Sequence, residues 1–261
     1  PSRVYKSQLN SNEYLEEIPN SVPLINASKI SGRLNNGLGI AVFNGITAAQ
    51  SGKAIDSETS TERDITISPL SNYNVLVLDQ NLKNNSFLTF TNTNVWRSGD
   101  FYDANVSGLT ASFNTKNNDY FISGQGVLSA ILESTQTSLG HTWGIELGKQ
   151  RGDFTFWTEY YEESDTYDPN DLGFLRANNS RVAEAKIGYR NFKPSFWNLN
   201  KFQSNFSVNY ERLYAPNLFG GAFWNSRAVM VSKSFNAWGI NFNGALMENN
   251  DFFEPRGQNI G

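Results

Sequence analysis

Hydrophobic and polar residues alternate one by one along much of this chain, which is the period of a β-strand with two different faces. In segment 138–149, one face carries apolar side chains while the other carries Gly, Thr and Glu. The residues on the apolar face of that segment are Leu139, His141, Trp143, Ile145 and Leu147. Segments 180–192, 201–212 and 238–249 repeat this alternation. The pattern predicts a sheet with one apolar face and one polar face.

Turn residues separate twelve such segments, and no stretch longer than a turn has the period of a helix. The predicted strands are 24–34, 38–48, 72–81, 87–97, 105–115, 120–132, 138–149, 154–162, 180–192, 201–212, 221–232 and 238–249. Most have about 9 to 13 residues, whereas globular strands average about five or six. A tilted strand needs about 9 to 11 residues to cross a bilayer. The lengths therefore favour an all-β fold, an antiparallel up-and-down transmembrane β-barrel.

The connections between these segments differ in length according to their order. Connections at 35–37, 82–86 and 116–119 are tight, whereas the two longest segments, 49–71 and 163–179, both follow even-numbered strands. Outer-membrane barrels have short periplasmic turns and longer extracellular loops. We therefore expect both long segments on the extracellular side. Twelve strands can close on themselves, or they can be part of a larger barrel.

Composition removes several classes of protein. The mean hydropathy is −0.46, and no apolar run approaches the ~18 residues of a transmembrane helix. The absence of Cys and the single His exclude disulfide scaffolds, thiol chemistry and His-rich metal sites. A net charge of −4 argues against nucleic acid as a partner, and no cofactor is expected. The 34 asparagines, many within predicted strands, fit a sheet with one wet face; a soluble sandwich with polar strands remains the alternative.

Charged residues of both signs fall on the predicted polar face, so we expect them to face the lumen of the barrel. These residues are Glu146, Glu159, Glu184, Lys186, Arg190, Glu211 and Arg227. They could pair across strands and partly fill the interior, or they could line a passage for polar solutes. The pattern along the chain does not separate a plugged barrel from an open one.

Acidic residues also gather towards and within the long segment 163–179. They are Glu159, Glu162, Glu163, Asp165, Asp168 and Asp171. Paired carboxylates are the groups that glycoside hydrolysis requires, and Asp168, Asn170 and Asp171 loosely resemble a calcium loop. The loop lacks the bidentate Glu of that motif, so a solvated extracellular loop with Asx turns is the simpler interpretation, and the metal is left open.

Two apolar residues in this loop, Phe174 and Leu175, would be exposed in an extended surface loop. We expect them to fold back over the mouth of the barrel and narrow it. Gly173 would permit a positive φ where the chain reverses before them. The loop is thus predicted to be a structural lid or a docking element rather than a catalytic site.

Three segments carry a family resemblance. They are the hairpin Leu24–Thr47, the loop Tyr167–Leu175 (YDPNDLGFL) and the closing Asp251–Arg256 (DFFEPR). The chain resembles a family of Bacteroidota outer-membrane proteins of unassigned function, which typically carry a carbohydrate-binding family-9-like domain ahead of a large β-barrel. The resemblance implies a barrel in the outer membrane. The first domain is missing here, so residues 1–261 are expected to be a single β-barrel domain from a longer chain.

The predicted function is that of a cell outer-membrane β-barrel with a transport, porin-like or surface-structural role, and not that of an enzyme. Its expected partners are outer-membrane lipid, other outer-membrane proteins and glycans. A second hypothesis is a soluble or surface glycan-binding β-protein that stacks sugars on Trp96, Trp157, Trp197 and Trp224. A third is a surface hydrolase that uses the loop carboxylates.

Overall fold

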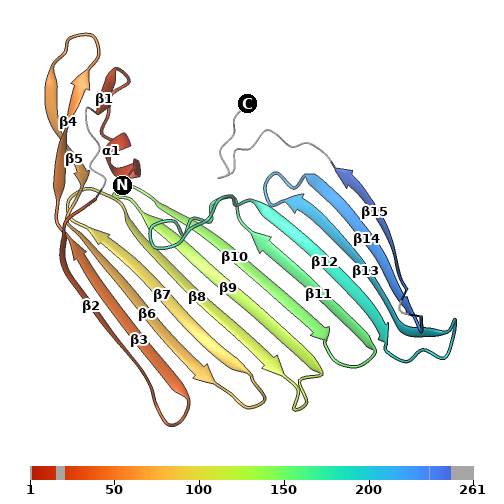
Figure 1. Cartoon of the computed structure of the whole chain (residues 1–261). Coiled ribbons are helices and arrows are strands. Elements are labelled where there is room, and N and C mark those ends of the chain that lie inside the picture. The colour runs from red at the N-terminus through yellow and green to blue at the C-terminus, as the bar shows by residue number, and fades with distance from the viewer. Residues whose placement is uncertain (1, 16–20, 235, 248–261) are drawn as a thin grey trace.

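The computed structural model describes residues 2–15, 21–234 and 236–247. Twelve long strands form one sheet, and three short strands beside helix α1 (Ser2–Lys6) form another (Figure 1). The short strands are β1 (Glu13–Leu15), β4 (Gln50–Asp56) and β5 (Glu62–Ser68), in the order β1-β4-β5. The described part of the chain has no helix long and apolar enough to cross a membrane.

The twelve-stranded sheet runs in the order β15-β14-β13-β12-β11-β10-β9-β8-β7-β6-β3-β2. Its strands are β2 (Leu24–Arg33), β3 (Leu38–Thr47), β6 (Ser71–Asn81), β7 (Phe87–Arg97), β8 (Asp103–Asn114), β9 (Tyr120–Leu132), β10 (Thr137–Lys149), β11 (Phe154–Glu163), β12 (Ser180–Asn191), β13 (Leu199–Leu213), β14 (Phe219–Ser232) and β15 (Ala237–Met247).

Every neighbouring pair in the large sheet is antiparallel, and each strand lies beside the next long strand along the chain. This order confirms the predicted all-β, antiparallel, up-and-down arrangement of the long strands. Within the described residues the sheet is not closed, because β2 and β15 lie at its two edges and do not pair with each other. Each of these two strands therefore pairs with one neighbouring strand only among the described residues.

The twelve predicted strands coincide with the twelve strands of the large sheet, and their ends differ by at most two residues. Local alternation is sufficient here because each strand has different environments on its two faces. The end of the predicted strand 238–249 and the segment Asp251–Arg256 lie outside the described residues.

The long segment 49–71, in which no strand is predicted, is more than a connection. This segment forms β4 and β5, which pair with β1 and stand above one corner of the large sheet (Figure 1). Their small core is made by Val4 of α1 with Ala54, Ile65 and Ile67, which are 0–4% exposed. β4 and β5 have 7 residues each, with few apolar positions and with charged residues beside them. The alternation of apolar and polar residues is therefore too short here to predict a strand.

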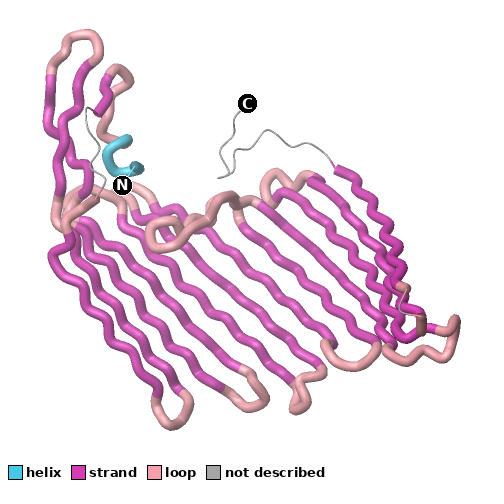
Figure 2. The backbone as a smooth tube through the Cα atoms, viewed as in Figure 1, coloured by secondary structure: helices cyan, strands magenta, loops and turns pink. Residues whose placement is uncertain are grey.

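Connections of the large sheet lie at two opposite edges (Figure 2). The segment 48–70, with the three-stranded sheet, and the loop 164–179 lie at one edge, called here the upper edge as in Figure 1. The tight turns 34–37, 82–86 and 115–119 lie at the other, lower edge. The predicted separation of long and short connections to two sides of the sheet is thus confirmed.

Candidate functional site

Charged side chains of the predicted lumen set share one face of the large sheet. Glu146 of β10 lies opposite Glu159 of β11, which lies opposite Glu184 of β12, so three carboxylates stand side by side across neighbouring strands. Glu184 in turn lies opposite Asn209 of β13. The register places the remaining members of the set on the same face: Lys186, Arg190, Glu211 and Arg227.

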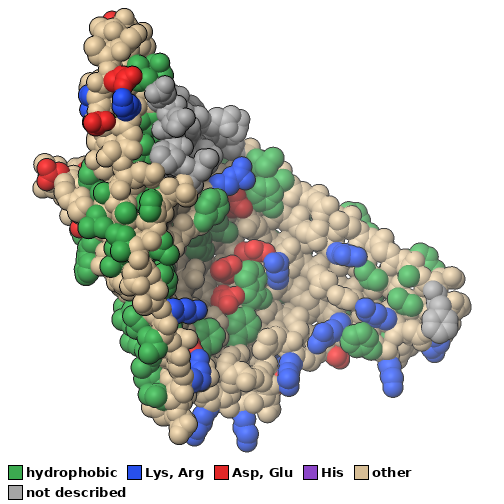
Figure 3. All heavy atoms as spheres, turned by 60° about the vertical axis from the view of Figure 1, so that its left-hand side comes forward, with side chains coloured by type: hydrophobic (Ala, Val, Ile, Leu, Met, Phe, Trp, Pro, Cys, Tyr) green, Lys and Arg blue, Asp and Glu red, His purple; other side chains and the backbone are tan. Residues whose placement is uncertain are grey.

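This polar face is the hollow side of the sheet. Figure 3 shows a hollowed surface on which Asp and Glu side chains gather near the middle, with Lys and Arg side chains towards the lower edge. Hydrophobic side chains cover the outer side of the strands nearest the viewer (Figure 3). Most of the acidic side chains on this face thus lie nearer the middle of the strands, and many of the basic ones lie nearer the lower turns.

Two of the three aligned carboxylates have partners. Trp157 Nε1 donates to Glu146 Oε2 at 2.9 Å, and Lys186 Nζ lies 2.6 Å from Glu184 Oε1. The Lys186 ammonium also lies 4.7 Å from the centre of the Trp157 ring. Glu159 stands between the two without an ion-pair partner among the described residues. The arrangement fixes the Trp157 ring and leaves net negative charge at the centre of the hollow face.

The loop 164–179 folds down onto the hollow face. Gly140 of β10 lies directly beneath it, and a Cβ built on Gly140 would lie 2.3 Å from Tyr167 Cα. Only glycine therefore allows the loop backbone to approach the strand this closely. Asp168 N donates to Ser129 Oγ of β9 at 3.1 Å, and Tyr167 is 8% exposed. Burial raises the pKa of the Tyr167 phenol above its usual range.

An ion pair holds the far end of this loop. Asp171 accepts hydrogen bonds from Arg97 Nη2 and, at 3.0 Å, from the Tyr102 hydroxyl. The Arg97 and Asp171 side chains are 7% and 12% exposed, and the Arg97 guanidinium lies 4.1 Å from the centre of the Tyr102 ring. Water is largely excluded from this pair, so it holds the loop far more firmly than a surface ion pair would.

One expectation about the loop is wrong, and the positive φ that Gly173 would permit is not adopted. Phe174 does not fold back, since it is 85% exposed, and the residues that pack inwards are Tyr167 and Asp171. Gly173 does not have a positive φ; its lack of a side chain matters because a Cβ would lie 2.8 Å from the Pro169 carbonyl oxygen. The inward packing depends on Gly140 and Arg97, which lie on other strands, so the loop sequence alone carries no signal of it.

The acidic residues of this region separate in the structure. Asp168 Oδ1 accepts hydrogen bonds from the backbone and side-chain nitrogens of Asn170 at 3.0 and 2.7 Å, which is the expected Asx turn. Asp171 points to Arg97 instead. Among the described residues, no three His, Cys, Asp or Glu side chains lie close enough together to hold a metal ion.

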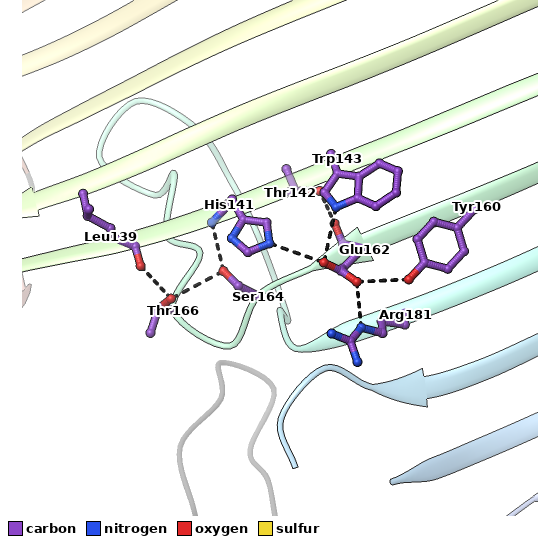
Figure 4. Close-up of polar contacts among 9 residues, drawn as sticks. All are labelled: Leu139, His141, Thr142, Trp143, Tyr160, Glu162, Ser164, Thr166 and Arg181. Atoms are coloured by element: carbon purple, nitrogen blue, oxygen red, sulfur yellow. Dashed lines mark hydrogen bonds and ion pairs between the residues drawn. The ribbon is translucent and has the colours of Figure 1, made fainter. Parts of the chain in front are cut away.

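Glu162 forms a polar cluster on the opposite, apolar face, close to the upper edge (Figure 4). Its carboxylate accepts hydrogen bonds from Arg181 Nε at 2.7 Å, the Tyr160 hydroxyl at 3.0 Å and Trp143 Nε1 at 3.3 Å. His141 Nε2 lies 3.4 Å from the same carboxylate. Trp143, Tyr160 and His141 each combine an apolar ring with a polar atom that contacts Glu162. Such side chains are typical of a boundary between an apolar layer and water.

A family model described as a domain of unknown function (DUF5916) matches residues 1–260. The chain belongs to the DUF5916 family. No curated protein matches this DUF5916 chain. Among solved structures, it is similar to a BenF-like porin from Pseudomonas fluorescens Pf-5, with 12% sequence identity and a TM-score of 0.39. That match covers 91% of this chain and 68% of the porin chain.

Proposed function

We propose that this DUF5916 chain forms the wall of a β-barrel in the outer membrane and that polar solutes pass along its hollow face. The observation that carries the proposal is an apolar band contributed by every strand of the large sheet. Its members, each at least 36% exposed and all on the face opposite Glu146, Glu159 and Glu184, include Ile30, Val42, Leu78, Leu88, Leu109, Leu128, Ile145, Phe154, Ile187, Phe206, Trp224 and Ile240.

An apolar surface of this extent is unfavourable in water. Soluble proteins rarely expose contiguous apolar patches larger than a few hundred Å², whereas lipid tails accept such a band without cost. The strands have 10 to 15 residues, enough to cross a bilayer when tilted. The proposal therefore assigns the apolar face to lipid and the charged hollow to water, with the Glu162 cluster at the interface.

The resemblance noted in the sequence supports the finer parts of this proposal. It favours a Bacteroidota outer-membrane origin, with a carbohydrate-binding family-9-like domain elsewhere in the full chain. Outer-membrane lipid, and other outer-membrane proteins at the sheet edges, are the partners that this location supplies. The proposed role is transport and not catalysis, with the loop 164–179 narrowing the passage.

A soluble glycan-binding protein is the second candidate. The register separates its proposed aromatic residues, because Trp96 and Trp224 lie on the apolar face whereas Trp157 lies on the hollow face. Trp197 lies in the lower connection between β12 and β13 and is 74% exposed. No common platform for a sugar chain is formed by all four, which favours the membrane proposal.

The test is ion conductance after reconstitution into planar lipid bilayers. The wild-type protein should conduct, and Asp171→Ala should conduct more, because the loss of the Arg97 partner frees the loop from the hollow face. Breaking such a pair costs about 3–5 kcal/mol of local stability. Asp165→Asn is the matched control: it removes one charge from the same loop, but Asp165 has no side-chain partner among the described residues, so conductance should not change.

Detergent dependence provides the second readout. The folded protein should require detergent and should migrate differently on gels before and after heating. A monodisperse, detergent-free protein that never conducts would contradict the membrane proposal and favour the soluble one. If the protein conducts and Asp171→Ala has the same conductance as Asp165→Asn, the barrel proposal stands. The loop 164–179 then does not narrow the passage.

A further inference from the structure

A groove of about 580 Å³ lies on the hollow face below the row of carboxylates. Residues of β9, β11, β12 and β13 line it, together with Lys149 and Gln150 at the end of β10, and Gly188 is the glycine among them. The hollow-face residues that matter below are Phe121, Trp157, Gly188, Arg190, Gln203 and Asn205. None of them belongs to the loop that covers the upper part of the face.

Aromatic rings form one side of this groove. In register, Gly148 lies between Phe121 of β9 and Trp157 of β11. A Cβ on Gly148 would lie 2.8 Å from the Phe121 ring, so the absent side chain makes room for that ring. Trp157 is held on its other side by Glu146 and Lys186. A ring that is fixed before a ligand arrives loses little conformational entropy on binding.

Amide groups form the other side. Gly188 lies opposite both Thr155 and Asn205, and a Cβ on Gly188 would lie 3.0 Å from Asn205 Oδ1. The side chains of Asn205 and Gln203 have no hydrogen-bond partner among the described residues. An amide offers both donors and an acceptor, as the hydroxyl groups of a sugar require.

A cation without an acidic partner completes the groove. Arg190 Nε donates to the Gly152 carbonyl oxygen at 3.3 Å, which leaves its two terminal nitrogens available. Arg227 lies opposite Asn205, and neither arginine has a carboxylate partner among the described residues. A guanidinium binds a carboxylate through two parallel hydrogen bonds.

We propose that this groove binds an acidic saccharide, with a sugar ring on Trp157, hydroxyl groups on Asn205 and Gln203, and a uronate carboxylate on Arg190. The proposal rests on the proposed function only in requiring that the hollow face be wet. A stacked ring, free amides and an unpaired guanidinium within one groove match a uronic acid better than a neutral sugar, which would leave Arg190 unpaired.

The experiment is isothermal titration calorimetry of the detergent-solubilised protein with trigalacturonate, and with maltotriose as the neutral probe. Trigalacturonate should bind at least tenfold more tightly than maltotriose. Trp157→Ala should weaken trigalacturonate binding by at least tenfold. Arg190→Gln, which removes the charge with little change in size, should bring trigalacturonate down to the affinity of maltotriose. Trp224→Phe, on the apolar face, is the control and should leave both affinities unchanged.

These outcomes are separate from the conductance test. A conducting protein that does not bind trigalacturonate, or that binds it as well after Arg190→Gln as before, overturns the saccharide site and leaves the barrel in place. Equal binding of the two probes overturns the assignment of an acidic ligand. Since Trp157→Ala removes a partner of Glu146 and Lys186, its heat-dependent gel migration is measured alongside, and Arg190→Gln decides the matter if the Trp157 variant does not fold.

Discussion

Neighbouring residues of β10 lie in opposite environments. Ile145 is 43% exposed on the apolar face, flanked across the strands by Gly124 and Tyr160. Thr142 is 4% exposed on the hollow face, where its hydroxyl donates to the Glu162 carbonyl oxygen at 3.0 Å. Ile145 thus has room but no polar partner, whereas Thr142 has a polar partner but no room.

The first prediction concerns which face contacts lipid. Ile145→Arg should lower the free energy of unfolding in lipid by roughly 2–4 kcal/mol, because it puts a charge against the hydrocarbon. The control is Ser123→Arg, since Ser123 lies opposite Glu146 on the hollow face and an arginine there would meet carboxylates. Thr142 is too buried to serve as a control. Urea unfolding in lipid vesicles measures the free energy of unfolding of both variants. An equal decrease in the two would contradict the assignment of the faces.

At the scale of elements, the three-stranded sheet is held together by an arginine that reaches across its middle strand. Arg63 of β5 donates to both carboxylate oxygens of Glu13 of β1, at 2.7 and 2.6 Å, past β4. Its hydrogen bonds, together with that from Asn10 N, hold the pKa of Glu13 at about 2. The contact joins the first described residues to a hairpin 50 positions later in the chain.

The second prediction follows from that lowered pKa. The ordinary pKa of Glu13 is 4.5, so the ion pair stabilises the three-stranded sheet fully above pH 4.5, and this contribution is lost as the pH falls towards 2. Amide exchange in β1 and β5, corrected for the intrinsic rate at each pH, should lose protection over that range. Glu13→Gln should be less protected at pH 7 and should lack this pH dependence.

Glu62→Gln is the control for this element. Glu62 pairs with Lys53 at 2.5 Å on the exposed side of the hairpin, where water screens the two charges. Its replacement should change protection little at either pH. If amide protection in Glu13→Gln falls with pH as it does in the wild type, a group other than Glu13 causes the pH dependence.

At the scale of the whole molecule, the up-and-down order places connections of one parity at each edge of the sheet (Figure 2). The upper edge carries the three-stranded sheet and the loop 164–179, and the lower edge carries the tight turns. If the sheet crosses a membrane, the two edges face different compartments. The longer connections then define the extracellular side.

The third prediction tests that orientation. The chain has no Cys, so a single cysteine can be placed at either edge without background labelling. Ser57→Cys lies between β4 and β5 at the upper edge, and Lys116→Cys lies between β8 and β9 at the lower edge; both positions are exposed. A membrane-impermeant maleimide added to intact cells should label Ser57→Cys alone. Labelling of Lys116→Cys alone would reverse the orientation.

The sequence by itself determined the twelve long strands, their up-and-down order and the two faces of the sheet. These features depend on a period of two residues and on the lengths of connections, both of which are local properties of the chain. The same period placed Glu146, Glu159 and Glu184 on one face. It did not align them, because register between strands depends on how each turn closes.

Only the tertiary structure decided how the upper connections fold. The inward path of the loop 164–179 depends on Gly140 and on Arg97, which is 74 positions away from Asp171 in the chain. The three-stranded sheet depends on Glu13 and Arg63 and on four buried apolar residues. Such contacts join segments that are far apart in the chain and follow no period, so no local pattern of residues predicts them.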